Sequence, residues 1–534
     1  MRSGRVSRRE WLWVAGWSAV LLLLTSLPYL LGVLLETSES TFGGFVIALE
    51  DGNTYLAAMR QGAEGRWSFH IPFTPETHAP GYVFPFYLLL GKIGRWLGIS
   101  LPLTFHLAKI VTTPFLLVAV YRFAAHFTTW QMVRRLCLLL VALGGGLGWL
   151  WLLLGQPFAP GMMPTDLWVP DASAFLTMLT FPHLALAQAL ILWVAVSGLQ
   201  LVAEPSWGRT AITSVLGLML SAVHPYSVPL TLGLLGLWWV WQAWRTRRPG
   251  WSSLVQLSVI GLVAAPYLMY VYTLFSSNPV FHSWQVQNRI RSPNPLHYVL
   301  GYGLIGLLAL VALLRPHPLR QWRHYHFLIL WVVLVPVGLY VPSNLQRRFL
   351  DGYQVPLSLL AISGLLYLLR YVPRAWRWRA TIAFVVVSLL SNVVLLMGST
   401  AVVASRSPLV FQQRQVLSAM DWLGTHAPPD SVVLAAYDTG NLLPARALVR
   451  TFVGHGPQSV NADEKRAQVA AFFGDDASDE QRVSLLTTYQ IDYLFYGPSE
   501  RALGGFTPGT LPCLHQVYDG GRTQVYRVLL EDDR

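Results

Sequence analysis

Long apolar segments recur along this chain from its beginning to about residue 404, and they constrain its fold more than any other feature. The first, from Trp11 to Leu35, contains no charged residue. Since about 20 apolar residues cross the hydrocarbon core of a bilayer, we interpret it as a retained membrane span rather than a cleaved signal peptide. Further spans are predicted near 82–98, 101–124, 136–154, 177–203, 210–223, 226–244, 254–275, 297–314, 327–341, 353–370 and 380–404.

The composition agrees with this assignment. Of the 534 residues 54% are hydrophobic and only 12% are charged, which is about half the charge expected of a soluble protein. The net charge of +12 would suit a nucleic-acid partner. However, the arginines lie in short connectors between apolar segments, where they orient helices in the membrane. The predicted class is an α-helical polytopic membrane protein with about 11–13 transmembrane helices, in contact with membrane lipids and with no nucleic acid.

The distribution of charge predicts the topology. Arginines are concentrated in the segments 2–9, 245–248, 315–323 and 370–379, so these are expected to be cytoplasmic. The first loop, residues 36–81, is rich in acids and is expected to be external. The loops 155–176, 276–296 and 342–352 share the external side with it.

One conflict remains in this topology. Arg122, Arg134 and Arg135 look cytoplasmic, yet two full spans after an external loop would return the chain to the outside. Either residues 82–124 hold three short segments or one piece is re-entrant, and the prolines in this region make broken helices reasonable.

The last part of the chain, residues 406–534, has a different pattern and is predicted to be a small external α/β domain. It follows a membrane module, residues 1–405, that includes the first loop. A buried strand and a turn are expected in 431–440, strands in 491–497 and 523–530, and helices in 461–474 and 478–490, with Ser478 as N-cap and Gln481 as its capping-box partner. The segment "FVGHGPQS" (452–459) lacks the glycine spacing and the lysine of a phosphate loop. It is either a turn or part of a site.

The first loop contains the adjacent acids Glu50 and Asp51. Leu49, Leu56, Met59 and Ala63 would share one face of a helix, and Asp51, Tyr55 and Gly62 the opposite face. This pattern predicts a short amphipathic helix at the membrane interface. The acids could simply favour the helix N-terminus, with Glu50 as a capping partner. That alternative suits Asp51 less, because Gly52 and Asn53 beside it do not favour a helix.

A second group of polar residues is "VPSNLQRRFLDGYQ", residues 341–354. Arg347 and Arg348 are expected outside, against the usual bias of basic residues toward the cytoplasm. A bound phosphate would explain them, because guanidinium groups donate bidentate hydrogen bonds to phosphate. The alternative is a lipid headgroup contact or a salt bridge to Asp351.

A third group consists of Asp166 and Asp171 in an external loop, His183 one turn into the next span, and His224 in "AVHPYS" at the outer end of another. Each histidine alone could be a hydrogen-bonded structural residue. Together they place imidazoles and carboxylates on one face, which could hold a divalent metal ion, although their spacing matches no metal signature.

These features resemble the GT-C superfamily of integral-membrane glycosyltransferases, which use polyprenyl-phosphate sugars. The resemblance covers about residues 11–404. It depends on the architecture and on Glu50-Asp51, "FPH", "HPY" and "QRRFLDGYQ". In that family an acidic residue of the first external loop is the general base or a metal ligand. By position this residue is Asp51, with Glu50 as the alternative.

The resemblance implies transfer of a sugar from a polyprenyl-phosphate donor to a glycan, lipid or protein acceptor on the outer face of the membrane. Asp51 would be the base, Arg347 or Arg348 would bind the leaving phosphate, and His183, His224, Asp166 and Tyr55 would line the substrate site. A transporter, a non-catalytic scaffold, or an acyl- or phospholipid-modifying enzyme are the alternatives. The absence of an N-x-S/T sequon favours a prokaryotic plasma membrane.

Overall fold

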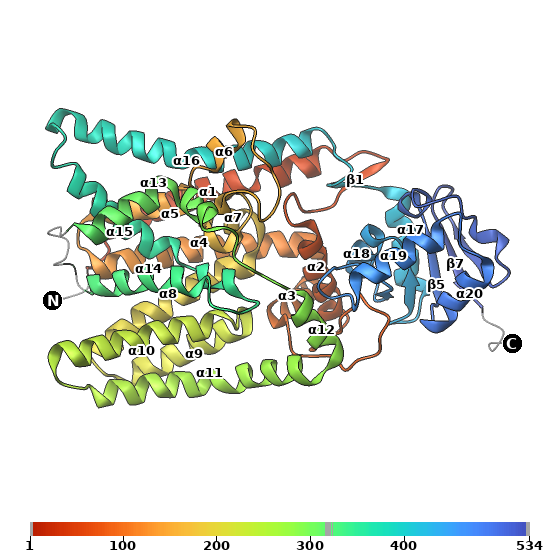
Figure 1. The fold of residues 1–534 in the computed structure, drawn as a ribbon, viewed down its shortest axis with the longest axis horizontal. Helices are drawn as coiled ribbons and strands as arrows, with labels where there is room; N and C mark the ends of the chain where they lie inside the picture. The colour runs from red at the N-terminus through yellow and green to blue at the C-terminus, as the bar shows by residue number, and fades with distance from the viewer. Residues whose placement is uncertain (1–3, 316–321, 323, 530–534) are drawn as a thin grey trace. The chain divides into compact units, whose positions relative to one another are not determined.

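A computed structural model of the chain describes residues 4–315, 322 and 324–529 (Figure 1). Arg2, Arg320 and Arg323, which belong to predicted cytoplasmic segments, lie outside these residues. The chain divides into two compact units, which we describe separately. The helical unit comprises Met1–Pro28, Leu107–Met269 and Ile290–Thr400. The α/β unit comprises Tyr29–His106, Tyr270–Arg289 and Ala401–Arg534.

The helices that lie wholly or mainly in the helical unit follow the predicted spans closely. They are α1 (Arg8–Leu34), α4 (Leu101–Phe127), α5 (Gln131–Leu143), α6 (Gly148–Leu153), α7 (Ala174–Thr180), α8 (Pro182–Ala203), α9 (Trp207–Val223), α10 (Ser227–Thr246), α11 (Trp251–Ser277), α13 (Pro295–Leu314), α14 (Tyr325–Gly338), α15 (Gln354–Leu368) and α16 (Arg374–Ala404). Among the described residues, 7 helical segments are long and apolar enough to cross a membrane, and α9, α14 and α15 are shorter apolar helices. The predicted polytopic helical fold is confirmed.

Two of the predicted spans are broken. The segment 136–154 is divided into α5 and α6 by a turn at Gly144–Leu147, and 177–203 is divided into α7 and α8 at Phe181. Phe181 is extended, with φ −125° and ψ 126°, because a residue before proline is disfavoured in helical conformation. These breaks free backbone groups from helical hydrogen bonds and place His183 in the first turn of a helix.

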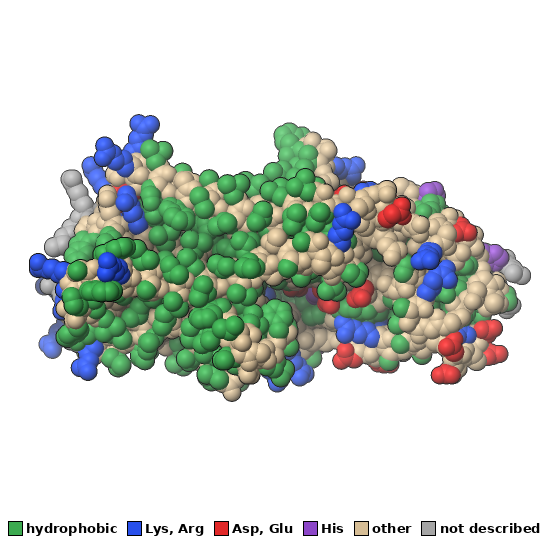
Figure 2. All heavy atoms as spheres, turned by 90° about the horizontal axis from the view of Figure 1, so that it is seen from above, with side chains coloured by type: hydrophobic (Ala, Val, Ile, Leu, Met, Phe, Trp, Pro, Cys, Tyr) green, Lys and Arg blue, Asp and Glu red, His purple; other side chains and the backbone are tan. Residues whose placement is uncertain are grey.

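The outside of the helical unit is apolar. Large hydrophobic side chains such as Leu23, Val111 and Leu262 are exposed there, and Figure 2 shows hydrophobic atoms covering this surface. Lysine and arginine side chains gather at the end of the unit where the chain begins (Figure 2). An apolar surface with basic residues at one end is the pattern expected of a polytopic membrane protein.

The predicted span at 82–98 is wrong. It is the helix α3 (Pro85–Leu97) of the α/β unit, which has 13 residues and contains Lys92 and Arg95, and it is neither among the helices apolar and long enough to cross a membrane nor among the shorter apolar helices. Its apolar face packs on α2 (Leu49–Ala63) so closely that a Cβ on Gly91 would lie 1.9 Å from the Met59 carbonyl oxygen. With α3 excluded as a full span, α4 alone follows the first loop, which removes the topological conflict at Arg122, Arg134 and Arg135.

The α/β unit contains a mixed sheet in the order β4-β3-β5-β7-β6. Strands β4, β3 and β5 are parallel, whereas β7 runs antiparallel to β5 and β6. The strands are β3 (Val432–Leu434), β4 (Arg450–Thr451), β5 (Tyr493–Tyr496), β6 (Leu514–Asp519) and β7 (Gln524–Val528). The helices of this unit, besides α2 and α3, are α12 (Pro279–Gln287), α17 (Arg414–His426), α18 (Tyr437–Arg446), α19 (Ala462–Phe473), α20 (Asp479–Thr488) and α21 (Pro498–Arg501). The predicted capping box of Ser478 and Gln481 is present.

The first loop and residues 406–534 fold together within the α/β unit. Strand β1 (Ser40–Phe42) pairs antiparallel with β2 (Phe411–Gln413). Arg66 donates two hydrogen bonds to the Asp430 carboxylate, at 2.7 and 3.1 Å. The proposed division at residue 405 concerns the membrane topology and stays a prediction.

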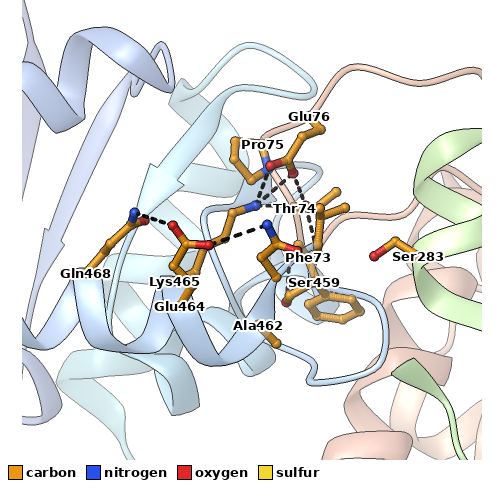
Figure 3. A network of polar contacts seen from close by, with 12 residues as sticks. Phe73, Thr74, Pro75, Glu76, Ser283, Ser459, Ala462, Glu464, Lys465 and Gln468 are labelled. Carbon is orange, nitrogen blue, oxygen red and sulfur yellow. Dashed lines mark hydrogen bonds and ion pairs between the residues drawn. The ribbon is translucent and has the colours of Figure 1, made fainter. Parts of the chain in front are cut away.

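The buried ammonium group of Lys465 provides a further connection between the first loop and residues 406–534 (Figure 3). Lys465 Nζ, on α19, donates to both carboxylate oxygens of Glu76 in the first loop, at 2.6 and 2.8 Å. Thr74 also donates its hydroxyl to Glu76 and accepts from Lys465. Because burial lowers the pKa of Lys465, the carboxylate of Glu76 is needed to hold its charge.

Candidate functional site

The two acids of the first loop begin helix α2, and their surroundings differ. Ala48 precedes the helix in a left-handed conformation, φ 51°, and no side chain caps it, so Glu50 is not the capping partner. Instead, Glu50 accepts a hydrogen bond of 2.9 Å from the Tyr437 hydroxyl. Asp51 keeps 51% of its side chain exposed, with one carboxylate oxygen 3.5 Å from His455 Nε2. Both side chains are exposed, but the carboxylate of Glu50 is engaged in a hydrogen bond with a tyrosine, whereas that of Asp51 lies beside a histidine.

The faces of α2 are only partly as predicted. Leu56, Met59 and Ala63 are buried as expected, but Gly62, expected on the open face, is buried too. The reason is α3, whose Leu88 carbonyl oxygen lies 2.0 Å from where a Cβ on Gly62 would be. Tyr55 is stacked on Tyr87, with ring centroids 4.3 Å apart. The open part of α2 is thus confined to its first turn.

The basic pair lies in the helical unit on a short 3-10 helix, η4 (Gln346–Leu350). Arg348 forms a salt bridge of 2.7 Å with Asp171, which lies on η2 (Pro170–Ala172). This partner differs from Asp351, the one considered from the sequence. The Arg347 guanidinium carbon is 4.4 Å from the ring centre of Trp168, a cation–π geometry that orients it.

A buried histidine and a buried aspartate lie beside this salt bridge. His224 Nδ1 is 3.0 Å from Asp351 Oδ2 and 2.8 Å from the Ser227 hydroxyl, and Ser227 donates a hydrogen bond of 2.8 Å to the same carboxylate. His183 follows Pro182 at the start of α8, and its ring centre is 6.4 Å from that of His224. The helical unit therefore brings His183, His224 and Arg348 together, with both aspartates among them.

The pKa values of Asp171 and Asp351 are shifted in opposite directions. Burial would raise the pKa of Asp171, but the Arg348 guanidinium outweighs it and lowers that pKa below its usual range. Burial, together with the nearby negative charge of Asp171, raises the pKa of Asp351 well above its usual range. One carboxylate is thus held charged by an arginine, while its neighbour favours the neutral form.

These residues could also hold a divalent ion. Asp171, His224 and Asp351 are buried, and each offers a ligand atom within 4.8 Å of the others. His224 Nε2 and Asp351 Oδ1 are buried and have no hydrogen-bond partner among the described residues. Two carboxylates and an imidazole are donors that suit zinc or manganese. The donor set fits a cation.

The carboxylate of Asp166 is held by backbone hydrogen bonds. It lies on η1 (Thr165–Leu167), and its carboxylate accepts hydrogen bonds from the backbone N–H groups of Gly146 and Gly148, at 2.8 and 3.3 Å. These are the groups freed by the break between α5 and α6. Burial raises the pKa of Asp166 to about 6. Its role as a substrate-binding residue stays a prediction.

No role is predicted from the sequence for His455 or Tyr437, and Asp351 is considered there only as a salt-bridge partner of the arginines. His455 lies in "FVGHGPQS", a segment that the sequence singled out without assigning it a partner. Since Tyr437 and Glu50 are 387 residues apart in the chain, only the folded structure could pair them.

Several solved structures have a fold similar to that of this chain. The Archaeoglobus fulgidus oligosaccharyltransferase has a TM-score of 0.52 and 11% identity, over 97% of this chain and 75% of that one. The mycobacterial arabinofuranosyltransferase AftD has a TM-score of 0.54 and 16% identity, over 100% of this chain and 40% of that one. ArnT from Cupriavidus metallidurans, solved with undecaprenyl phosphate, has a TM-score of 0.51 and 11% identity, over 97% and 98%.

No protein-family model and no curated protein sequence matches the chain. The structural similarity covers nearly the whole chain and includes three enzymes with the GT-C architecture. The chain therefore has the fold of the GT-C membrane glycosyltransferases, and the predicted fold class is confirmed.

Proposed function

We propose that this protein is an integral-membrane glycosyltransferase that takes a sugar from a polyprenyl-phosphate donor and transfers it to an acceptor hydroxyl. The observation that carries the proposal is the exposed carboxylate of Asp51 at the first turn of α2, in a chain with the GT-C fold. Two similar structures support a lipid-phosphate donor, since one contains dolichol-phosphate and another undecaprenyl phosphate.

The proposed chemistry needs a base and a phosphate site. Asp51 removes the proton of the acceptor while the acceptor attacks the anomeric carbon, a type of help worth about a hundred- to ten-thousand-fold in rate. The leaving group is the lipid phosphate, whose charge Arg347 and Arg348 stabilise. Arg347 is positioned for this role by Trp168, and Arg348 by Asp171.

Transfer can be tested in membranes that contain the overproduced protein. A polyprenyl-phosphate sugar labelled in the sugar is added, and the label is followed into lipid-free and lipid-linked products. The proposal requires that wild-type membranes release polyprenyl phosphate and move the label to an acceptor. Uptake of a solute into vesicles, without any consumption of the labelled donor, would instead indicate a transporter.

We further propose that Asp171, His224 and Asp351 hold a divalent cation, which would neutralise charge on the donor phosphate. A similar structure, the Archaeoglobus fulgidus oligosaccharyltransferase, was solved with zinc and sulfate. Asp351 is the residue to change, since its Oδ1 has no hydrogen-bond partner among the described residues.

The cation is tested by binding rather than by activity. The purified protein should retain stoichiometric manganese or zinc in equilibrium dialysis, whereas Asp351→Asn should weaken binding by about tenfold or more, since even the loss of an outer-shell partner of a metal ligand costs about ten- to a hundredfold in affinity. Asp166→Asn is the matched control, because this carboxylate belongs to a separate set of backbone hydrogen bonds. Equal metal content in wild type and Asp351→Asn would contradict the assignment.

We also propose that the protein lies in a plasma membrane with the residues before α1 in the cytoplasm and residues 406–534 outside. With α3 excluded, the apolar helices α1, α4, α5–α6, α7–α8, α9, α10, α11, α13, α14, α15 and α16 alternate so that the arginine-rich connectors share one side. This number is at the low end of the predicted about 11–13 spans.

Reporter fusions test this orientation. Fusions at Arg248 and Arg379 should give the signal of a cytoplasmic reporter, and a fusion at Asp430 should give that of an external one, because the basic connectors stay inside. A cytoplasmic signal at Asp430 would contradict the orientation and would leave the carboxylate of Asp51 on the wrong side for an external reaction.

A further inference from the structure

Polar contacts from three residues, Tyr437, Asn441 and His455, hold the first turn of α2. Tyr437 donates its hydroxyl hydrogen to Glu50. Asn441 accepts a hydrogen bond of 2.8 Å from the Asn53 amide. His455 lies against Asp51. Both sides of these contacts belong to the α/β unit.

Two close backbone approaches place His455 there. A Cβ on Gly440 would lie 2.0 Å from the Val453 carbonyl oxygen, and one on Gly454 would lie 2.3 Å from the Gly440 carbonyl oxygen. The Ser459 hydroxyl then fixes the turn, since it accepts from the backbone N–H groups of Gly454 and His455 and donates to the Phe73 carbonyl oxygen at 2.7 Å. Only glycine allows the two segments to lie this close.

The imidazole itself is enclosed. Its side chain is 8% exposed, whereas that of Asp51 is 51% exposed. Phe73 packs beside it, with ring centroids 5.6 Å apart. Its Nδ1 is buried and has no hydrogen-bond partner among the described residues, so Nε2, toward Asp51, is the nitrogen with a polar neighbour.

Tyr437 is fixed in a similar way. Its hydroxyl accepts from the backbone N–H of Gly456 at 2.8 Å while it donates to Glu50. The Arg466 guanidinium carbon lies 3.6 Å from its ring centre. The carboxylate of Glu50 is therefore occupied by this hydroxyl and is not free to act as the base.

We propose that His455 is a positioning residue, which holds the carboxylate of Asp51 in the orientation needed to accept a proton. The proposal rests on the proposed glycosyl transfer. A base that must meet one hydroxyl works best in one orientation, and a misplacement of about 1 Å can cost about a hundredfold in rate. Because Asp51 is half exposed, its pairing with His455 contributes little to folding, so its loss is expected in turnover and not in stability.

The test compares His455→Leu, which removes the polar nitrogens, with His455→Gln, whose amide nitrogen can occupy the place of Nε2. His455→Leu should lower kcat by tenfold or more, leave KM for the polyprenyl-phosphate sugar within about twofold, and keep the thermal midpoint of the wild type. His455→Gln should recover most of the kcat. His515→Leu, the same change at an exposed residue of β6, is the matched control.

A double variant separates positioning from a general structural effect. If His455 acts through Asp51, Asp51→Asn with His455→Leu should be no slower than Asp51→Asn alone. Full activity of His455→Leu beside an inactive Asp51→Asn would overturn this proposal and leave the proposed function intact. Multiplied losses in the double variant, with no recovery by Gln, would also overturn it. Full activity of Asp51→Asn would remove both this proposal and the assigned base.

Discussion

Turnover is expected to fall by two or more orders of magnitude when Asp51 is replaced by Asn, while the purified protein still folds and still binds the lipid donor. The substitution keeps the shape of the side chain and removes its ability to accept a proton, which is worth about a hundred- to ten-thousand-fold. Since Asp51 is half exposed and pairs, within the described part of the chain, with His455, folding should be little affected. The measurement is the rate of sugar transfer from a defined polyprenyl-phosphate sugar.

Glu50→Gln is the control for this prediction. Its carboxylate is occupied by the Tyr437 hydroxyl, and a Gln carbonyl oxygen can accept the same hydrogen bond. We therefore expect a much smaller loss. If Glu50→Gln abolished transfer while Asp51→Asn retained it, the assignment of the two carboxylates would be reversed.

The second large effect concerns the basic pair, whose two members should respond differently. Arg347→Gln is expected to raise the Kd of the lipid-phosphate donor by about tenfold to a hundredfold, since a hydrogen bond between charged groups contributes about 1.5–3 kcal/mol. Its cation–π contact with Trp168 contributes little to the free energy of folding, so the stability of the protein should change little.

Arg348→Gln should also destabilise the protein. It would leave the carboxylate of Asp171, which is only 8% exposed, without its guanidinium partner, at a cost of roughly 3 kcal/mol. Thermal unfolding of both variants, combined with donor binding, tests this difference. An unchanged donor affinity in both variants would contradict the phosphate site and would leave a lipid headgroup as the contact.

The helices were largely predictable from the sequence because membrane spans depend on local composition. The predicted spans 101–124, 254–275 and 297–314 lie within three residues of the limits of α4, α11 and α13. The exception is α3. Lys92 and Arg95 within it are a local signal against a membrane span, but the packing of its glycines against α2 depends on tertiary structure.

The candidate site was predictable in its residue types and only partly in its partners. His183, His224 and Arg348 were singled out one by one, and the structure brings them together. Arg348 pairs with Asp171 rather than with Asp351, which is closer in the sequence. This pairing depends on the position of the loop before α7, which the fold determines. The pairing of Asp51 with His455 joins residues about 400 apart along the chain, and a single sequence contains no signal for such a contact.

The most direct test of the account is the lipid that the protein carries after purification. Detergent-solubilised wild-type protein should contain polyprenyl phosphate, detected by mass spectrometry of its extracted lipids, and should bind added polyprenyl phosphate far more tightly than the matching polyprenol. Arg347→Gln should carry little of it. Equal binding of the alcohol and the phosphate, with no co-purified polyprenyl phosphate in the wild type, would contradict a lipid-phosphate donor.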